Sequence, residues 1–284
     1  MENISFVHTA QFGFRTPVYC IISDERVHRI KSPLMYNRIM QQMGLNGAYV
    51  PFKVAPDDLG QALASLRVLN ISGANITVPY QERASQFMDI LSEGAQIIGA
   101  INTVVCKEGK LKGYNTNAIG FMDALSAADF EVAGKRALVF GTGGAAKAVA
   151  FIFNWLQADE VTIVGRNKDR TKALADKVNG RALLLEQLND VPVQADIVVN
   201  TTSISSPNES RKLADLISRL NVIHCQLFYD LNYGRRTNFW QQRADALEIA
   251  FFDGTAVLAY QARRTFSLWT GMDVPPEIFL KALE

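Results

Sequence analysis

Three closely spaced glycines carry the clearest chemistry in the sequence. Gly141, Gly143 and Gly144 follow a short apolar run and precede the Ala-rich stretch that begins at Ala145. Glycines at the end of a buried strand let the backbone turn tightly and approach a pyrophosphate, which then lies on the positive N-terminal end of the next helix. A tight turn without a ligand would use the same residues. The succession of strand, glycine turn, helix and second strand nevertheless favours dinucleotide binding.

The residues after the second strand indicate which dinucleotide is bound. An acidic residue about 20 positions beyond the glycines would bind the ribose of NAD, whereas an arginine there accommodates a 2′-phosphate. This chain has no acid directly after the strand and reads Gly165, Arg166 and Asn167, with Arg170 nearby. Guanidinium groups form charge-assisted, bidentate bonds with phosphate, so we predict NADP(H) as the cofactor. The alternative is that both arginines are solvated surface charges.

Short apolar runs must position these residues. They alternate with longer helical patterns, which predicts an α/β protein with mainly parallel sheets. The predicted strands cover residues 18–22, 75–78, 137–140, 161–164, 197–200 and 227–231.

Composition limits the partners. The 284 residues include 29 basic and 28 acidic side chains. Hydrophobic residues make up 48% of the chain, which is enough for one large or two modest domains with a full core. Because the charge is balanced, there is no field to attract nucleic acid or an anionic membrane. We therefore expect a small-molecule substrate, no nucleic acid and no membrane, in a monomer or a homodimer.

Three cysteines and the first residues of the chain bear on its compartment. The cysteines, at positions 20, 106 and 225, are far apart and lack the spacing of metal ligands, so no metal site is expected. We expect them to be buried, reduced thiols, as in a cytoplasmic protein. The first 15 residues lack the apolar core of a signal peptide, and no apolar run is long enough to span a membrane. A cytoplasmic protein is expected.

Seven blocks occur along the chain in a fixed order, and with them it resembles the shikimate dehydrogenase family. They are Ser32-Pro33, residues 75–79, residues 99–103, residues 113–116 with Gly120, the glycine turn, residues 200–203, and Asp253-Gly254 followed by Gln261 and residues 268–271. The resemblance implies a substrate domain over residues 1–115, completed by helices in residues 255–284, and a Rossmann-like NADP domain over residues 116–254. Members reduce 3-dehydroshikimate to shikimate by hydride transfer to a ring ketone.

The resemblance also implies the roles of individual residues. Those that match the family's substrate-binding positions are Ser32, Thr77, Asn102, Tyr233 and Gln261. Further cofactor contacts are expected at Ala145, Asn167, Thr201 and Gly254, in addition to the three glycines and the two arginines.

Three positions depart from the family pattern. Gln81 stands where the family has a lysine, and Asn117 stands where it has an aspartate; in the family these two form an ionic pair on the reacting hydroxyl. Ile30 replaces the first serine of the carboxylate-binding SxSP element. Losing one partner of a buried ion pair costs about 3–5 kcal/mol, whereas losing both avoids that cost. We therefore interpret Gln81 and Asn117 as a coupled exchange that yields a neutral amide pair.

The exchange has a predicted consequence for catalysis. Neither amide ionises in the working range, so a general acid–base contribution of roughly 10²- to 10⁴-fold is expected to be absent. His28 is one alternative proton donor, although a lone histidine in a basic loop is commonly a surface residue. Tyr36 and Tyr233 are others, with Tyr36 expected to pack in the core and Tyr233 to bind substrate.

Three functional hypotheses follow from the sequence. The first is an NADP-dependent oxidoreductase acting on shikimate or 3-dehydroshikimate or, as the amides favour, on a related cyclic keto or imino substrate. The second is a protein that binds cofactor and ligand without turnover, as a sensor or partner subunit. The third, an inactive variant of an ordinary shikimate dehydrogenase, is disfavoured by Ile30 and by the missing Gly-x-Pro turn upstream of it.

Overall fold

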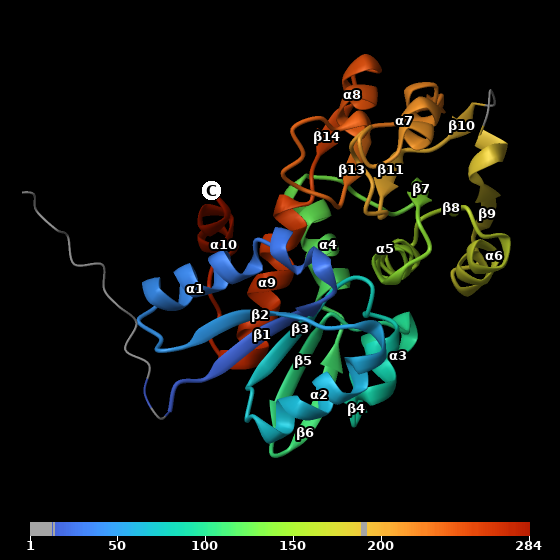
Figure 1. The fold of residues 1–284 in the computed structure, drawn as a ribbon. Coiled ribbons are helices and arrows are strands. Elements are labelled where there is room, and N and C mark those ends of the chain that lie inside the picture. Colours follow the sequence, from blue (N-terminus) through green and yellow to red (C-terminus); the bar gives the residue numbers. More distant parts are fainter. Residues whose placement is uncertain (1–12, 14, 189–191) are drawn as a thin grey trace, which may run out of the picture. The chain divides into compact units, whose positions relative to one another are not determined.

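The computed structural model describes residues 13, 15–188 and 192–284, which fold into two compact units (Figure 1). The first unit comprises the described parts of Met1–Ser92 together with Ile101–Tyr114 and Phe266–Glu284. The second comprises Glu93–Ala100 and the described parts of Asn115–Thr265. Most of the N-terminal stretch analysed for a signal peptide lies outside the described residues. None of the described helices is long and apolar enough to cross a membrane.

The units differ from the predicted domains in two places. Residues 93–100 belong to the second unit, because Ile98 and Ala100 pack in its core. The C-terminal segment rejoins the first unit at Phe266 rather than at residue 255, because Val257 also packs in the core of the second unit.

The first unit contains a six-stranded sheet in the order β2-β1-β3-β5-β6-β4. Its strands are β1 (Val18–Ser23), β2 (Ala48–Lys53), β3 (Gly73–Ile76), β4 (Ile90–Leu91), β5 (Thr103–Lys107) and β6 (Lys110–Tyr114). Its α-helices are α1 (Ser32–Gln42), α2 (Leu59–Val68) and α10 (Pro276–Leu283), and its 3-10 helices are η1 (Glu25–Arg29), η2 (Pro56–Asp58) and η3 (Arg83–Phe87).

A tight turn gives this sheet its antiparallel part. Glu108 and Gly109 both have positive φ, which lets β5 turn directly into β6. As a result β5 and β6 are antiparallel. β5 is also antiparallel to β3, whereas β1 is parallel to both β2 and β3.

The second unit contains an all-parallel sheet in the order β14-β13-β11-β7-β8-β9. Its strands are β7 (Arg136–Phe140), β8 (Glu160–Gly165), β9 (Arg181–Leu184), β11 (Ile197–Asn200), β13 (Leu227–Asp230) and β14 (Ala250–Phe252). Numbered along the chain, this order is 6-5-4-1-2-3, the Rossmann arrangement, in which ligands bind outside the carboxyl ends of the strands where the order reverses. That switch point lies between β7 and β11.

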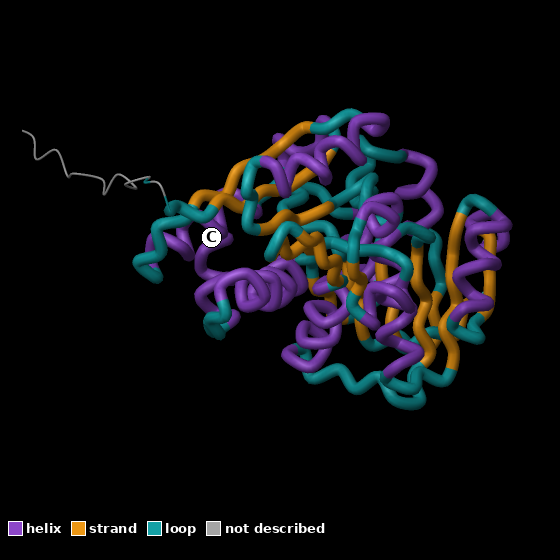
Figure 2. The backbone as a smooth tube through the Cα atoms, turned by 90° about the horizontal axis from the view of Figure 1, so that it is seen from below, coloured by secondary structure: helices purple, strands orange, loops and turns teal. Residues whose placement is uncertain are grey.

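Helices cover both faces of this sheet (Figure 2). One core includes residues of α3 (Glu93–Ile98), α4 (Thr116–Ala127), α5 (Gly144–Trp155), α6 (Lys168–Lys177) and α9 (Thr255–Thr270). The opposite core includes residues of α7 (Arg211–Ser218), α8 (Phe239–Ala246) and η4 (Leu185–Leu188). A small parallel ladder joins β10 (Val193–Gln194) to β12 (Val222–Ile223).

The predicted α/β class with mainly parallel sheets is confirmed. Five of the six predicted strands match an observed strand to within one residue at either end. The exception is β3, which is shifted two residues towards the N-terminus from the predicted run at 75–78.

Candidate active site

The glycine turn lies at the switch point of the second sheet. Gly141 follows β7 with φ +121°, and a Cβ there would lie 2.3 Å from the Oγ1 of Thr201, so only glycine fits. Gly143 is the N-cap of α5; it provides no side-chain cap, and a Cβ built there would meet no atom within 4 Å. Because glycine has no side chain, Gly143 does not cap the first N–H groups of α5. A helix start that binds phosphate requires such uncapped N–H groups.

Thr201 joins the two strands that flank the switch point. Its backbone N–H and its hydroxyl both donate to the carbonyl of Phe140, at 2.9 and 2.6 Å. Thr201 thus lies beside Gly141, where a ligand bound to the glycine turn would meet it.

The arginines predicted to select NADP(H) follow β8 on the neighbouring side of the turn. Asn167 is the N-cap of α6 and accepts a hydrogen bond from the N–H of Arg170 at 3.0 Å. The Arg170 guanidinium donates to the carbonyl of Thr142 at 3.2 Å, which places it against the glycine turn. Arg166 is exposed directly after β8. The residues present therefore fit a dinucleotide that carries an additional phosphate on its adenosine ribose.

The first unit gathers three predicted site residues at one edge of its sheet. Thr77 follows β3, and Asn102 precedes β5 beside it: the N–H of Ile76 donates to the Asn102 carbonyl at 2.8 Å. Gln81 is buried at the same edge, where its side-chain Nε2 donates to the carbonyl of Ile76 at 3.3 Å and its backbone carbonyl accepts from the N–H of Ile101 at 2.9 Å.

Buried hydrogen bonds hold this edge in place. The Asn75 amide donates to the carbonyl of Asn102 at 3.1 Å and to the hydroxyl of Thr103 at 3.3 Å, and its oxygen accepts from the hydroxyl of Tyr49 at 2.8 Å. Ser23, the last residue of β1, donates to the carbonyl of Val78 at 2.9 Å.

The SxSP element follows the same end of β1. Ile30 ends η1 and is half-buried, and Ser32 is the buried first residue of α1. The Lys31 ammonium between them donates to the carbonyl of Leu283 at 3.3 Å, which ties the element to α10.

Asn117 and Gln261 come from two helices that pack closely in the second unit. Asn117 lies in the first turn of α4, half-buried, and Gln261 lies buried on α9. The Thr116 hydroxyl donates to Gln261 Oε1 at 3.2 Å. A Cβ at Gly120 would lie 2.6 Å from the backbone nitrogen of Gln261, so this glycine permits the close approach of the helices.

Tyr233 and Gly254 follow the neighbouring strands β13 and β14. Gly254 donates to the carbonyl of Asn232 at 2.9 Å, and a Cβ there would lie 2.1 Å from the carbonyl oxygen of Leu231. Tyr233 lines a cavity of about 290 Å³ together with residues that include Arg235 and Gln241.

Comparisons with known proteins agree with this architecture. Three family models match: the shikimate dehydrogenase substrate binding domain over residues 22–104, the shikimate / quinate 5-dehydrogenase domain over residues 124–235, and the shikimate 5′-dehydrogenase C-terminal domain over residues 254–284. The chain is 36% identical over 262 residues to shikimate dehydrogenase (NADP(+)) of Desulforamulus reducens, with 89% of each chain covered.

The chain belongs to the shikimate dehydrogenase family.

Solved structures extend the comparison. Shikimate 5-dehydrogenase of Thermus thermophilus, solved in complex with NADP(H) and shikimate, has a TM-score of 0.82 and 32% identity, covering 94% of this chain and 98% of that one. The ligand-free 5-ketofructose reductase of Gluconobacter sp. strain CHM43 has a TM-score of 0.78 and 25% identity, covering 95% and 99%. The predicted family is thus confirmed, and relatives carry in their names the cofactor that the arginines predict.

The structure also distinguishes the alternative proton donors. His28 is exposed on η1. Tyr36 is 1% exposed and stacks on Tyr49 at a ring-centroid distance of 4.7 Å, with Trp269 tilted against it at 5.4 Å. Tyr36 therefore packs in the core of the first unit, as expected, and is enclosed by other aromatic rings.

Asp230 is the residue that sequence reasoning missed. It is fully buried at the end of β13, where Asn200 and Asn238 donate to its carboxylate at 2.8 and 2.7 Å. Burial raises the pKa of Asp230, and hydrogen bonds from Ser205, Asn232, Asn238 and Asn200 oppose that increase. The only signal in the sequence was an acidic residue at the end of an apolar run.

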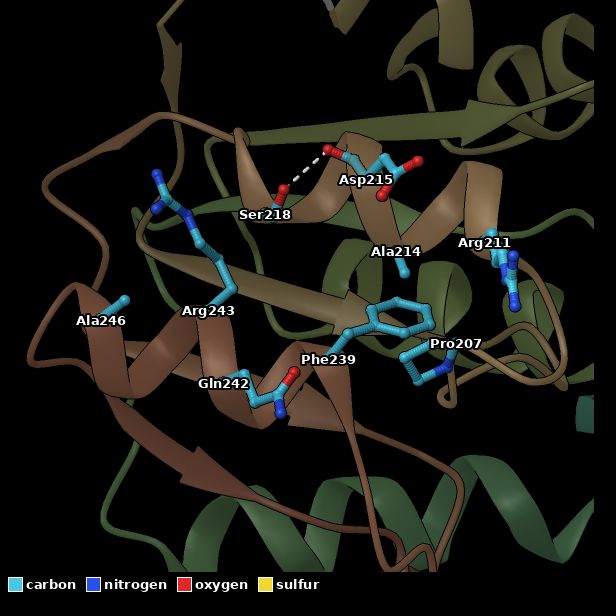
Figure 3. Close-up of a pocket in the computed structure, with 9 residues that line it drawn as sticks. All are labelled: Pro207, Arg211, Ala214, Asp215, Ser218, Phe239, Gln242, Arg243 and Ala246. Atoms are coloured by element: carbon cyan, nitrogen blue, oxygen red, sulfur yellow. Dashed lines mark hydrogen bonds between the residues drawn. The ribbon is translucent and has the colours of Figure 1, made fainter.

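A second cavity, of about 340 Å³, lies between α7 and α8 (Figure 3). Arg243 on its wall donates two hydrogen bonds to the carbonyl of Leu220, at 2.8 and 2.7 Å. These bonds connect α8 to the segment that follows α7. No residue predicted for the site lines this cavity.

Proposed function

We propose that the chain is an NADP(H)-dependent oxidoreductase that transfers hydride to a cyclic polar keto or imino compound related to, but distinct from, 3-dehydroshikimate. The observation that carries the proposal is that neutral amides, Gln81 and Asn117, occupy the two positions that are charged in the family pattern, whereas other substrate-binding positions match it. Those residues are Ser32, Thr77, Asn102, Tyr233 and Gln261.

The glycine turn, Thr201, Gly254 and the two arginines would hold the cofactor. When bound, NADPH supplies a hydride to the substrate. Gly143 would leave room for the diphosphate at the start of α5, Gly141 lets the chain turn there, and Arg166 and Arg170 would bind the 2′-phosphate. Thr77, Asn102 and Gln261 would hold hydroxyl groups of the substrate.

The amides restrict the chemistry. Their N–H groups can polarise a carbonyl by hydrogen bonding, but they cannot release a proton to the oxygen as negative charge develops. An imine that arrives protonated needs no such donor, and neither does a substrate with its own acidic group. Ile30 replaces a hydroxyl donor by an apolar contact, which favours a ligand less polar than shikimate at that point.

The ketofructose reductase supports this breadth of substrate. Its name specifies a polyhydroxy ketone other than 3-dehydroshikimate, and its chain shares the fold over nearly the full length. We infer that the family scaffold accepts different ketones once the residues around the reacting carbon change.

A ligand-binding protein without turnover is the second candidate, and the same amides favour it. One experiment separates the two. NADPH absorbance is followed with 3-dehydroshikimate, 5-ketofructose and a panel of cyclic ketones and imines, and NADPH binding is titrated by fluorescence. We expect turnover of a panel member and little turnover of 3-dehydroshikimate. Rapid reduction of 3-dehydroshikimate would refute the proposed substrate, and tight NADPH binding without turnover would favour the second candidate.

A further inference from the structure

One buried carboxylate lies where the second unit presents its cofactor and substrate residues. Asp230 is 0% exposed and is paired in register with Asn200 at the end of the adjacent strand β11. Both residues therefore lie at the carboxyl edge of the parallel sheet, where ligands of this fold bind.

Five donors converge on this carboxylate. Oδ1 accepts from the amide of Asn200 at 2.8 Å and from both the backbone and the side-chain N–H of Asn232 at 3.0 Å. Oδ2 accepts from the amide of Asn238 at 2.7 Å, and the Ser205 hydroxyl is a further partner. An ionised carboxylate only accepts hydrogen bonds, so it satisfies all these donors together.

The same partners extend into two loops. Asn200 Oδ1 accepts from the N–H and the hydroxyl of Thr202 at 3.0 and 2.7 Å, which fixes the loop after β11. Asn232 Nδ2 donates to the carbonyl of Thr202 at 2.7 Å and to the hydroxyl of Ser205 at 2.8 Å. The loop that contains Thr201 is thereby tied to the loop that contains Tyr233.

An ion pair also connects the same two loops. Glu209 Oε2 accepts from the N–H groups of Ser205 and Ser206 at 2.8 and 3.0 Å, and its Oε1 lies 2.9 Å from a guanidinium nitrogen of Arg235. Arg235 and Glu209 are partly exposed, so we expect this ion pair to contribute less to holding the two loops together than the fully buried carboxylate does.

We propose that Asp230 is a positioning residue that holds the Thr201 loop and the Tyr233 loop in the arrangement that binds cofactor and substrate. This inference rests on the proposed function for the roles of Thr201 and Tyr233. Without the carboxylate, the amides of Asn200, Asn232 and Asn238 lose their common acceptor, and each loop must find new partners.

The test uses Asp230→Asn in the full-length protein. This change keeps the side-chain shape but turns one acceptor into a donor that faces the Asn238 amide. We expect native circular dichroism and an NADPH dissociation constant raised by about tenfold or more. Asp215→Asn is the matched control, because it removes the same charge from the exposed side of α7 and should leave binding unchanged.

A reciprocal exchange separates positioning from general damage. In Asp230→Asn with Asn238→Asp, the new amide can donate to a carboxylate at residue 238, which reverses one hydrogen bond, and aspartate remains a good N-cap for α8. NADPH affinity should return to within about threefold of the unmodified protein. A folded Asp230→Asn variant with unchanged affinity, or a folded double variant without recovery, would overturn the inference.

Two further measurements keep the test decisive. If Asp230→Asn does not fold, Asn232→Ala retains the carboxylate but removes the bonds to Thr202 and Ser205, and it should also weaken NADPH binding; unchanged binding would count against the inference. If the unmodified protein does not bind NADPH, the proposed function fails separately. Amide hydrogen exchange then decides: faster exchange in both loops of the variant supports the positioning role of Asp230, and unchanged exchange refutes it.

Discussion

At the scale of single residues, we predict that Arg166 and Arg170 determine which nicotinamide cofactor the chain prefers. Arg170 lies against the glycine turn through the Thr142 carbonyl, and Arg166 is exposed immediately after β8. We expect Arg166→Gln with Arg170→Gln to weaken NADPH binding by about tenfold or more, because charge-assisted bonds to the 2′-phosphate are lost. Binding of NADH, which lacks that phosphate, should change little.

Fluorescence titration with both cofactors measures this preference. Lys177→Gln is the control, since it removes a positive charge from the exposed far end of the same helix, α6. If the unmodified protein binds NADH as tightly as NADPH, the assignment of the arginines is wrong.

The cysteines provide a second residue-scale prediction. Burial raises the pKa of Cys20 to about 12 and that of Cys225 to about 11, whereas Cys106 is half-buried and its pKa is raised less. Because the thiolate is the nucleophile, iodoacetamide at pH 8 should modify Cys106 first in the native protein. Peptide mass spectrometry over time checks the order, and labelling of Cys20 as fast as Cys106 would contradict the burial described.

At the scale of elements, we predict that two glycines of the turn have different roles: Gly141 is required for folding and Gly143 for cofactor binding. Gly141→Ala forces a Cβ against Thr201 at a positive φ and should destabilise the protein by about 1–3 kcal/mol. Gly143→Ala meets no protein atom and has an ordinary φ of −88°, so stability should change little while the added methyl group occupies the space offered to a phosphate.

Urea unfolding and NADPH titration of the two variants test this distinction. The expected pattern is lower stability for Gly141→Ala, and weaker binding with near-native stability for Gly143→Ala. Unimpaired NADPH binding by Gly143→Ala would show that no phosphate lies at the start of α5.

At the scale of the whole molecule, the sequence predicted most of the strands and the glycine turn because local signals are strong there. Runs of buried β-branched residues predict strands, and glycines at positions that need a positive φ predict turns, from the local sequence alone. The unit boundaries were harder to predict. Residues 93–100 and the first part of α9 belong to the second unit through packing of Ile98, Ala100 and Val257, and one sequence does not reveal which core such residues join.

The site shows the same division between local and distant signals. Thr77, Asn102 and Gln81 were predicted from blocks of sequence, and the structure gathers them at one sheet edge through hydrogen bonds of the backbone and of Gln81. Asp230 was not predicted, because its role depends on donors up to 30 positions away, such as Asn200. Long-range polar networks of this kind leave no periodic pattern in the sequence.

We propose that Gln81 and Asn117 remove the acid–base chemistry of the family from this chain. Restoring both family residues, by Gln81→Lys with Asn117→Asp, should raise shikimate-dependent reduction of NADP+ by about 10²- to 10⁴-fold. Each single substitution should raise it much less, because it introduces one charge without its partner.

The direct measurement is the rate of NADPH formation at the nicotinamide absorbance band, with shikimate as substrate, for the unmodified protein, both single variants and the double variant. We expect the unmodified protein to form NADPH very slowly and the double variant alone to show a large increase in rate. Shikimate oxidation by the unmodified protein at the rate of the double variant would contradict this expectation.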